Sequence, residues 1–217
     1  MPPTLIVNEV FHSIQGEGTR AGLPCSFVRL TGCNLRCDWC DTRDAWYNGT
    51  EMTFEQILEA LGRAPCRRVE VTGGEPLSQE RAPPLLKALC DAGFEVLLET
   101  NGSQDISAVD PRVVRIVDFK CPSSLMDAHN QWANVRCLTA RDEVKFVLGD
   151  RGDFEYARQA VLERELLEIC PVIFSPVINR LPPADLAHWM LDDGQLQNVR
   201  LGLQLHRIIW PDEERGV

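Results

Sequence analysis

Three closely spaced cysteines constrain this chain more than any other feature. Cys33, Cys37 and Cys40 are separated by three and then two residues. A [4Fe-4S] cluster normally takes four thiolates, so three cysteines leave one iron open to another ligand. Structural zinc needs four closed ligands, and the nearest histidine, His12, lies well upstream. The spacing therefore favours a cluster with one open iron over a zinc site or three buried thiols without a metal.

Size and charge narrow the class of protein further. The chain has 217 residues, of which 44% are hydrophobic, so we expect one domain over residues 1–217. Nine cysteines are an odd number, which makes a disulfide framework a poor explanation. A formal charge of −10 disfavours binding to nucleic acid. The N-terminus lacks a signal-like apolar stretch and no apolar run could span a membrane, so we expect a soluble cytoplasmic protein.

Apolar β-prone runs alternate with amphipathic helical patterns, which is typical of an α/β fold. We predict strands near residues 5–10, 27–30, 69–72, 95–99, 113–119, 144–148, 172–174 and 199–203. We predict helices after the capping pair Thr53 and Gln56, over 83–92, from a cap at Asp153 to about 168, and over 183–192.

Unusual polar residues follow several of these strands. Cys33 comes after the second strand, Gly73 and Gly74 after the third, Glu99 ends the fourth and Lys120 ends the fifth. In a parallel sheet with crossover helices, loops at the carboxyl ends of the strands gather the chemistry. A complete eightfold barrel needs about 250 residues. We therefore predict a shortened, open (partial) TIM-like barrel.

At these residues the chain resembles the radical SAM superfamily. Its CxxxCxxC motif matches the three cysteines, and residues 71–76, Val-Thr-Gly-Gly-Glu-Pro, resemble its second motif, which by itself would be a tight turn. The resemblance implies that the open iron chelates S-adenosylmethionine and that one electron cleaves it to a 5′-deoxyadenosyl radical. It also implies a set of S-adenosylmethionine contacts: Gly73, Gly74, Glu75, Asp118, Phe119, Lys120 and Ser175.

A closer resemblance, to the 7-carboxy-7-deazaguanine synthase family, spans nearly the whole chain. It begins with Ser-Ile-Gln-Gly-Glu-Gly at residues 13–18 and continues through 27–30, 40–42, 99–102, 118–124 and 204–206. The family is a radical SAM lyase that contracts 6-carboxy-5,6,7,8-tetrahydropterin to 7-carboxy-7-deazaguanine with loss of ammonia, in queuosine and 7-deazapurine biosynthesis. The resemblance implies this reaction and an N-terminal substrate-binding extension on a radical SAM barrel.

The same resemblance implies the residues that bind the substrate. They are Ile14, Gln15, Gly16, Glu17, Arg29, Thr72, Glu99 and His206, among which Glu17, Arg29 and Glu99 are expected to be catalytic. A flat heterocycle rich in donors and acceptors needs such convergent polar groups. Arg29 lies in an apolar strand and needs an anion, either the substrate's carboxylate or a structural partner. A structural role is the alternative for two residues: His206 as a buried core histidine and Lys120 as a structural cation.

A magnesium site is implied at Thr42, two residues after the last cysteine. Mg²⁺ prefers six oxygen ligands, so a lone hydroxyl would need the substrate's carboxylate or water to complete the site. Without the resemblance, Thr42 would be a turn or cap residue.

Two other functions stay open at this point. A glycyl-radical-enzyme activase would share the cluster but act on a protein loop, and an iron-sulfur electron carrier would need no S-adenosylmethionine. The family resemblance also implies a flavodoxin-like electron donor and a homodimer.

Overall fold

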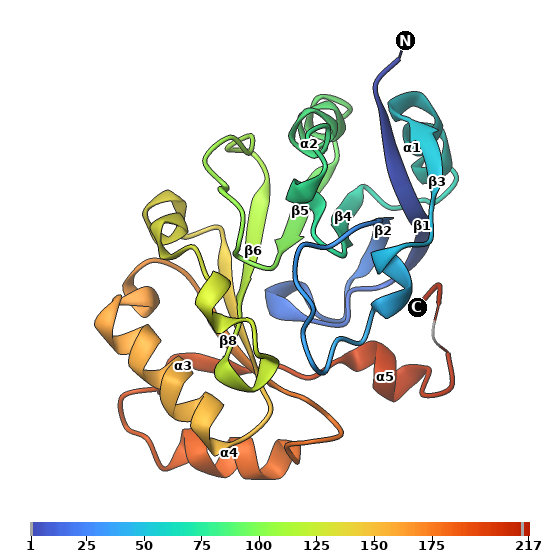
Figure 1. Cartoon of the computed structure of the whole chain (residues 1–217). Helices are drawn as coiled ribbons and strands as arrows, with labels where there is room; N and C mark the ends of the chain where they lie inside the picture. The colour runs from blue at the N-terminus through green and yellow to red at the C-terminus, as the bar shows by residue number, and fades with distance from the viewer. Residues whose placement is uncertain (1, 214) are drawn as a thin grey trace.

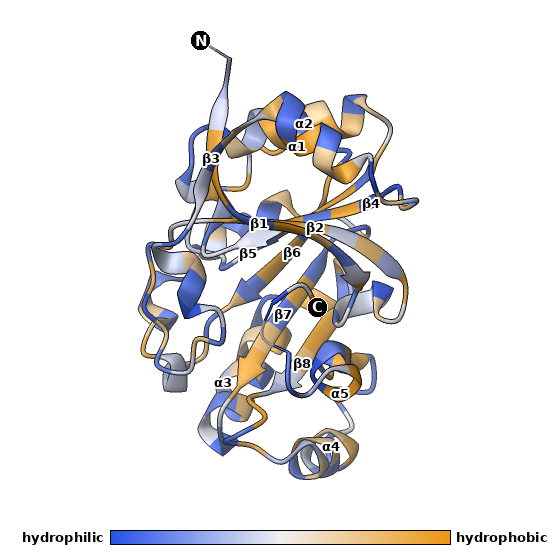
Figure 2. Ribbon diagram, turned by 90° about the vertical axis from the view of Figure 1, so that its right-hand side faces the viewer, coloured by the Kyte–Doolittle hydropathy of each residue, from blue (hydrophilic) through white to orange (hydrophobic). Residues whose placement is uncertain are grey.

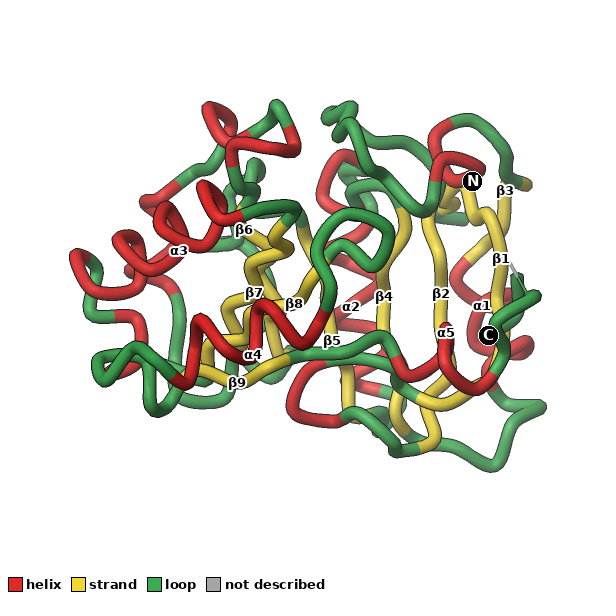
Figure 3. Tube along the Cα trace, turned by 90° about the horizontal axis from the view of Figure 1, so that it is seen from below, coloured by secondary structure: helices red, strands yellow, loops and turns green. Residues whose placement is uncertain are grey.

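A nine-stranded sheet forms the framework of the chain, which a computed structural model describes over residues 2–213 and 215–217. Its strand order is β3-β1-β2-β4-β5-β6-β7-β8-β9, so β3 and β9 are its edges and the sheet is open. Figure 3 shows the strands side by side. The strands are β1 (Thr4–Ile14), β2 (Pro24–Leu30), β3 (Thr50–Thr53), β4 (Arg68–Gly73), β5 (Glu95–Thr100), β6 (Val114–Phe119), β7 (Glu143–Leu148), β8 (Val172–Pro176) and β9 (Val199–Leu201).

The sheet is parallel from β2 and β4 through to β9, whereas β1 is antiparallel to both β2 and β3. The predicted open α/β arrangement is confirmed, and the antiparallel strand β1 adds a feature near the β3 edge that the prediction did not describe. The connection between β1 and β2 is too short for the crossover that a parallel pair requires. The sequence analysis also missed β3, because Thr-Glu-Met-Thr lacks the apolar alternation of a strand.

Helices cover the outside of the sheet, as Figure 1 shows, with α1 and α2 beside the first strands and α3 and α4 beside the last. Their bounds are α1 (Phe54–Leu61), α2 (Ala82–Asp91), α3 (Arg151–Glu163) and α4 (Pro183–Leu191). The short helix α5 (Leu205–Ile209) does not belong to this outer layer and packs on the segment after β1. None of the helices in the described residues is long and apolar enough to cross a membrane.

Helix caps explain where two of these helices begin. The predicted capping box at Thr53 and Gln56 is present at α1. The predicted cap at Asp153 is wrong: Asp150 caps α3 by accepting a hydrogen bond from the backbone N–H of Asp153 at 2.9 Å. Helix α3 also ends at Glu163 instead of near residue 168. The five-residue helix α5 was not predicted, because it is too short to show a helical period.

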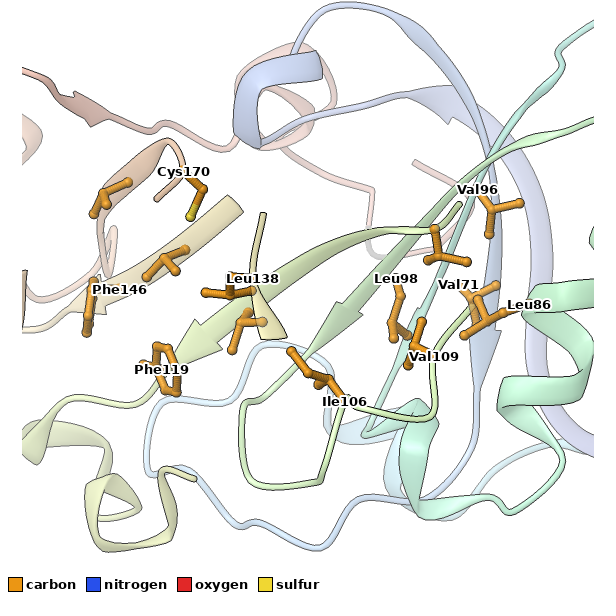
Figure 4. Packing of buried hydrophobic residues seen from close by; sticks show 14 of the residues in the cluster. Val71, Leu86, Val96, Leu98, Ile106, Val109, Phe119, Leu138, Phe146 and Cys170 are labelled. Carbon is orange, nitrogen blue, oxygen red and sulfur yellow. The ribbon is translucent and has the colours of Figure 1, made fainter. Parts of the chain in front are cut away.

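The main hydrophobic core lies between the sheet and its helices. Because side chains alternate between the faces of a strand, every second residue points outward to the helices. Figure 4 shows part of this cluster, and Figure 2 shows hydrophobic residues concentrated along the strands with hydrophilic residues in the loops. The outward set includes Val69, Val71, Val96, Leu98, Val117, Phe119, Val144, Phe146, Val172 and Phe174, all of which are buried. The alternate set therefore faces the inside of the open barrel.

Two glycines bring the end of β4 against the cysteine loop. Gly73 has a φ of +137°, and a Cβ there would collide with the backbone of Leu30. A Cβ on Gly74 would collide with the carbonyl of Gly32. The backbone N–H of Glu75 donates to that carbonyl at 2.8 Å. Small residues are needed here because the loops after β2 and β4 touch through their backbones.

Candidate functional site

One large cavity opens at the carboxyl ends of the strands, on the inner face of the sheet, with a volume of about 1070 Å³. Inward-facing residues of β2 and β4 to β8 line it, together with the cysteine loop, the segment after β1 and the C-terminal tail. It brings together nearly all of the predicted site residues. Those that line it are Ile14, Gln15, Gly16, Glu17, Arg29, Cys33, Cys37, Cys40, Thr42, Thr72, Gly73, Gly74, Glu99, Asp118, Lys120, Ser175 and His206.

The three cysteines of the loop after β2 are half-buried free thiols at the wall of this cavity. Burial raises the pKa of Cys37 to about 11 and also raises the pKa of Cys40, so binding of iron must displace protons from these thiols. In the part of the chain that the structure describes, no three metal-binding side chains converge as they would around a single ion. A [4Fe-4S] cluster carries its thiolates on different irons, so its three cysteines need not converge on one point.

Hydrogen bonds to two other segments hold the cysteine loop in place. The N–H of Gly32 donates to Ala45 at 2.8 Å, and the N–H of Asp38 donates to Ser124 at 3.2 Å. The indole of Trp39 donates to the hydroxyl of Ser123 at 3.1 Å. The loop that follows β6 therefore supports the face of the cysteine loop that borders the cavity.

Glu75 was predicted to contact S-adenosylmethionine, but its side chain faces the interior instead of the cavity. It is fully buried and accepts hydrogen bonds from the Thr100 hydroxyl and from the N–H groups of Leu77 and Asn101, at 2.7 to 2.9 Å. Burial raises the pKa of Glu75 above its usual range. Its carboxyl therefore ties the Gly73-Gly74 turn to the end of β5, which leaves only the backbone of this turn to meet a ligand.

Phe119 likewise points away from the cavity. Its ring is buried in the outer core and stacks on Trp132 with ring centres 4.4 Å apart. The neighbours Asp118 and Lys120 have the opposite phase on β6 and line the cavity.

Asp118 and Lys120 form an ion pair of 2.8 Å inside the cavity wall. Burial opposes the charge on Lys120, but the Asp118 carboxylate outweighs it and raises the pKa of Lys120 above its usual value. The second oxygen of Asp118, Oδ1, is buried without a hydrogen-bond partner in the described chain. A buried acceptor of this kind fits a ligand that brings hydroxyl donors, as the ribose of S-adenosylmethionine does.

At the other end of the cavity, two glutamates share one lysine. The ammonium group of Lys145, on β7, lies 3.0 Å from Oε1 of Glu99 and also contacts Oε2 of Glu17. Glu99 accepts a hydrogen bond from Thr72 at 3.1 Å, and Glu17 accepts one from Gln204 at 2.8 Å. Burial opposes the charge of Glu99, but Lys145 outweighs it and lowers the pKa of Glu99. Glu99 is therefore an anion at neutral pH.

A third carboxyl group, that of Glu70 on β4, lies behind this pair. It accepts a hydrogen bond of 2.5 Å from the amide of Gln15, whose oxygen accepts the N–H of Glu17 at 3.1 Å. Burial, followed by the charges of Glu99 and Glu17, raises the pKa of Glu70 well above its usual range. Glu70 therefore favours the neutral acid, and it sets the orientation of Gln15.

Glu70 and Lys145 were not among the site residues predicted from the sequence. Each is a charged residue between apolar neighbours in a buried strand, in the phase that faces inward. That break in an apolar run is the signal that could have identified them, since an unpaired charge would be costly there.

Arg29, on β2, has a structural partner, Glu9, which is one of the two alternatives expected from the sequence. Its Nε donates to Glu9 at 2.9 Å, and its guanidinium lies 5.5 Å from the centre of the Phe11 ring. It also lines the cavity. Because Glu9 contacts Nε, the terminal nitrogens of Arg29 remain for an anion from the cavity side.

His206, on α5, packs directly on Gly16. A Cβ at position 16 would collide with the imidazole ring, so only glycine allows this contact. The N–H of Leu205 donates to the carbonyl of Gly16 at 3.0 Å. Burial lowers the pKa of His206. Helix α5 therefore joins the segment after β1, and the neutral imidazole becomes part of the cavity wall.

Thr42 lies on the cavity wall between the cysteine loop and the C-terminal tail. Its hydroxyl donates to the carboxylate of Asp41 at 2.9 Å, and that carboxylate also accepts from Gln204 at 3.3 Å. The lone pairs of the hydroxyl remain available to a cation, and the neighbouring ligands are oxygen atoms, which suits Mg²⁺.

Comparisons with known proteins agree with these features. Residues 27–163 match the family described as the radical SAM superfamily. The 7-carboxy-7-deazaguanine synthase of Koribacter versatilis is 42% identical over 226 residues, covering 97% of this chain and 99% of that protein. The enzyme of the same name from Chlorobaculum tepidum is 45% identical over 218 residues, covering 98% and 97%.

Two solved structures share the fold. QueE from Escherichia coli superposes with a TM-score of 0.72 at 24% identity, covering 93% of this chain and 94% of that one. SuiB from Streptococcus suis, bound to S-adenosylmethionine, has a TM-score of 0.53 at 15% identity and covers 79% and 44%. A radical SAM domain implies a [4Fe-4S] cluster and S-adenosylmethionine, and the cavity offers donors for both. As its motifs predicted, the chain belongs to the radical SAM superfamily and, within it, to the 7-carboxy-7-deazaguanine synthase family.

Proposed function

We propose that the protein converts 6-carboxy-5,6,7,8-tetrahydropterin to 7-carboxy-7-deazaguanine with release of ammonia. The main support is that a single cavity is lined by the three cysteines and also by Gln15, Glu17, Arg29 and Glu99. A radical generated at the cysteine end would thus form next to groups suited to a carboxylated heterocycle. Residues 1–217 act as one radical SAM domain, in which the segment around β1 serves as the substrate-binding extension.

The polar groups of the cavity match the substrate in kind. The 2-amino group and ring N–H of a pterin are hydrogen-bond donors. The carboxylate oxygens of Glu17 and Glu99, both of which contact Lys145, are acceptors. Arg29 offers its terminal nitrogens to the carboxylate of the substrate, which suits the planar fork of a guanidinium. Ile14, Gly16, Thr72 and His206 complete the wall around the ring.

Cys33, Cys37 and Cys40 hold the cluster, and Gly73, Gly74, Asp118, Lys120 and Ser175 bind S-adenosylmethionine. Together these two cofactors supply the radical that abstracts hydrogen from the substrate. The protein's own part is to position the ring, exclude water and neutralise the charges of both ligands.

Mg²⁺ is the third cofactor in this proposal, bound at Thr42. The side-chain oxygens of Thr42 and Asp41 lie together here, and the carboxylate of the substrate and water would supply the remaining ligands. Thr42 would hold the ion, which would help to neutralise the carboxylate of the substrate.

The cellular partners of the proposal come from the family. They are a flavodoxin-like protein that delivers the electron and a second copy of the chain in a homodimer, with the enzyme in the cytoplasm. Among the alternatives, an activase acts on a protein loop and an electron carrier needs no substrate. Neither requires the paired glutamates of this cavity.

The decisive experiment is anaerobic reconstitution with iron and sulfide, followed by incubation with S-adenosylmethionine, Mg²⁺, a reductant and the carboxy-tetrahydropterin. Mass spectrometry should detect 7-carboxy-7-deazaguanine, together with ammonia in equal amount. Cleavage of S-adenosylmethionine without any change to the pterin would contradict the proposed substrate.

A further inference from the structure

Lys145 is the only cation in contact with the two inward-facing glutamates in the described chain. Its side chain is only 7% exposed, and it extends from β7 toward Glu17 on the segment after β1 and toward Glu99 on β5. Both carboxylates therefore lie within bonding distance of one nitrogen, although they come from distant parts of the chain. Their separation and direction depend on this ammonium group.

The charges of this cluster do not balance. Lys145 is the one cation within bonding distance of Glu17 and Glu99 in the described chain, and the carboxyl group of Glu70, which lies behind them, favours its neutral form. Carboxyl groups therefore outnumber the cations that contact them in this cluster. This end of the cavity therefore favours a ligand whose nearest groups are hydrogen-bond donors. It disfavours a ligand that places an oxygen acceptor there.

We propose that Lys145 is a positioning residue that aligns Glu17 and Glu99 as one paired acceptor and thereby sets the selectivity of the cavity for a 2-amino ring edge. The inference rests on the proposed pterin substrate. Lys145 does not touch the reacting atoms; it acts through the two glutamates.

Loss of the ammonium group has a defined electrostatic consequence. Glu99 faces Lys145 on β7 and Lys120 just after β6, while Glu70 on β4 and Glu17 after β1 belong to the same cluster. Asp118 on β6 acts on Lys145. Without Lys145, burial and two neighbouring carboxyl groups act on Glu99, with the more distant Lys120 as the remaining cation. One carboxyl group of the pair Glu17 and Glu99 then takes up a proton. Its hydroxyl can donate a hydrogen bond to an oxygen of the ligand.

The test compares binding of two unreactive ligands to the reconstituted holoenzyme with S-adenosylmethionine present. One is 6-carboxypterin, which has the 2-amino group, and the other is 6-carboxylumazine, which has an oxygen there. The parent should prefer 6-carboxypterin strongly, because a site built to accept hydrogen bonds rejects an acceptor. In Lys145→Met the dissociation constant of 6-carboxypterin should rise about 10- to 100-fold.

The preference between the two ligands should also collapse in Lys145→Met. Binding of 6-carboxypterin should weaken further as the pH falls from about 8 to about 6, as expected if a glutamate now titrates in that range. Lys145→Arg should restore much of the preference, because it returns a cation. If Lys145→Met does not fold, Lys145→Gln gives the same comparison, since it is neutral but can still donate hydrogen bonds.

Arg115→Met is the matched control. Arg115 is also a buried cation, with its side chain 8% exposed and paired to Asp142, but it lies outside the cavity. It should change the ligand preference by less than about twofold. An unchanged preference in Lys145→Met and Lys145→Gln would overturn the role of Lys145. A parent that binds neither ligand would remove the proposed substrate itself.

Discussion

Two buried clusters of charged side chains lie at opposite ends of the parallel strands and differ in how well their positive and negative charges match. At the amino ends, Arg115 pairs with Asp142 through two side-chain hydrogen bonds of 3.0 and 2.6 Å. Asp142 also accepts hydrogen bonds from the N–H of Arg115 and from the N–H and hydroxyl of Thr139. Every oxygen is used, and one cation meets one anion.

At the carboxyl ends, one lysine serves two glutamates, and a third glutamate lies behind them. These groups line the cavity, whereas Arg115 and Asp142 do not. Burying a charge is costly unless it is fully paired, so an unbalanced cluster persists only where the rest of the fold holds it. The comparison indicates that a balanced pair serves the fold and an unbalanced group at the cavity serves a ligand.

The largest expected effect at the cavity end is loss of the cluster. Cys37→Ala should abolish both cluster assembly and turnover, because it removes one of three thiolate anchors. Iron and sulfide analysis with the visible absorption spectrum measures this. Cys90→Ala is the control, since Cys90 is another half-buried thiol but lies outside the cavity. A full iron complement in the Cys37 variant would contradict the assignment.

Glu99→Gln should lower turnover of the pterin by about 100-fold while changing stability little, because it removes an anionic acceptor from the cavity. Steady-state kinetics of product formation gives the loss, and thermal unfolding gives the stability. Cleavage of S-adenosylmethionine without pterin should continue, which separates this effect from loss of the cluster. Parent-like turnover would place Glu99 outside the reaction.

Asp142→Asn should show the opposite pattern. Breaking a buried pair leaves Arg115 uncompensated and costs about 3 kcal/mol of unfolding free energy. Turnover per folded molecule should stay near the parent value. Burial opposes the charge of Asp142, but Arg115 outweighs burial and lowers the pKa of this carboxyl. The contribution of the ion pair to the free energy of unfolding is therefore present at neutral pH and is lost as the pH falls through the folded-state pKa. Urea unfolding at several pH values measures both effects, and the variant should lack the acid-dependent loss.

Thr42→Ala should reduce the response of turnover to Mg²⁺ by about tenfold, because one hydrogen-bonding oxygen ligand is lost while all thiolates remain. Rates across a Mg²⁺ titration for the parent and the variant measure this. The cluster content should be unchanged. Identical Mg²⁺ responses would show that Thr42 is only a turn residue.

The smallest expected effect concerns Glu70, whose pKa is raised by burial and by its acidic neighbours. A carboxyl group with a raised pKa in the folded state costs stability as the pH rises above its unfolded value. Glu70→Gln should therefore stabilise the protein at neutral pH, and its advantage should shrink as the pH falls. Unfolding across the pH range tests this against Glu59→Gln, an exposed position on α1. An advantage that does not depend on pH would contradict a neutral Glu70.

Local sequence was sufficient for several parts of this protein. The cysteine spacing, the glycine pair and the capping box at Thr53 each depend on residues that are close together along the chain. The alternating pattern predicted the α/β class, because the period of side chains is itself a local property. The length of the chain predicted that the barrel is open. The alternating pattern could also have separated Phe119 from Asp118 and Lys120, which have the opposite phase on one strand.

Tertiary structure alone decided which of these residues meet. Strand β1 pairs antiparallel to β2, and His206 packs on Gly16 from the other end of the chain. Lys145 contacts both Glu17 and Glu99, which come from separate segments. The direction of the Glu75 carboxyl, toward Thr100 and away from the cavity, also depends on such a contact. Charge and burial act through space, so the state of a carboxyl group is set by neighbours that its own stretch of sequence does not contain.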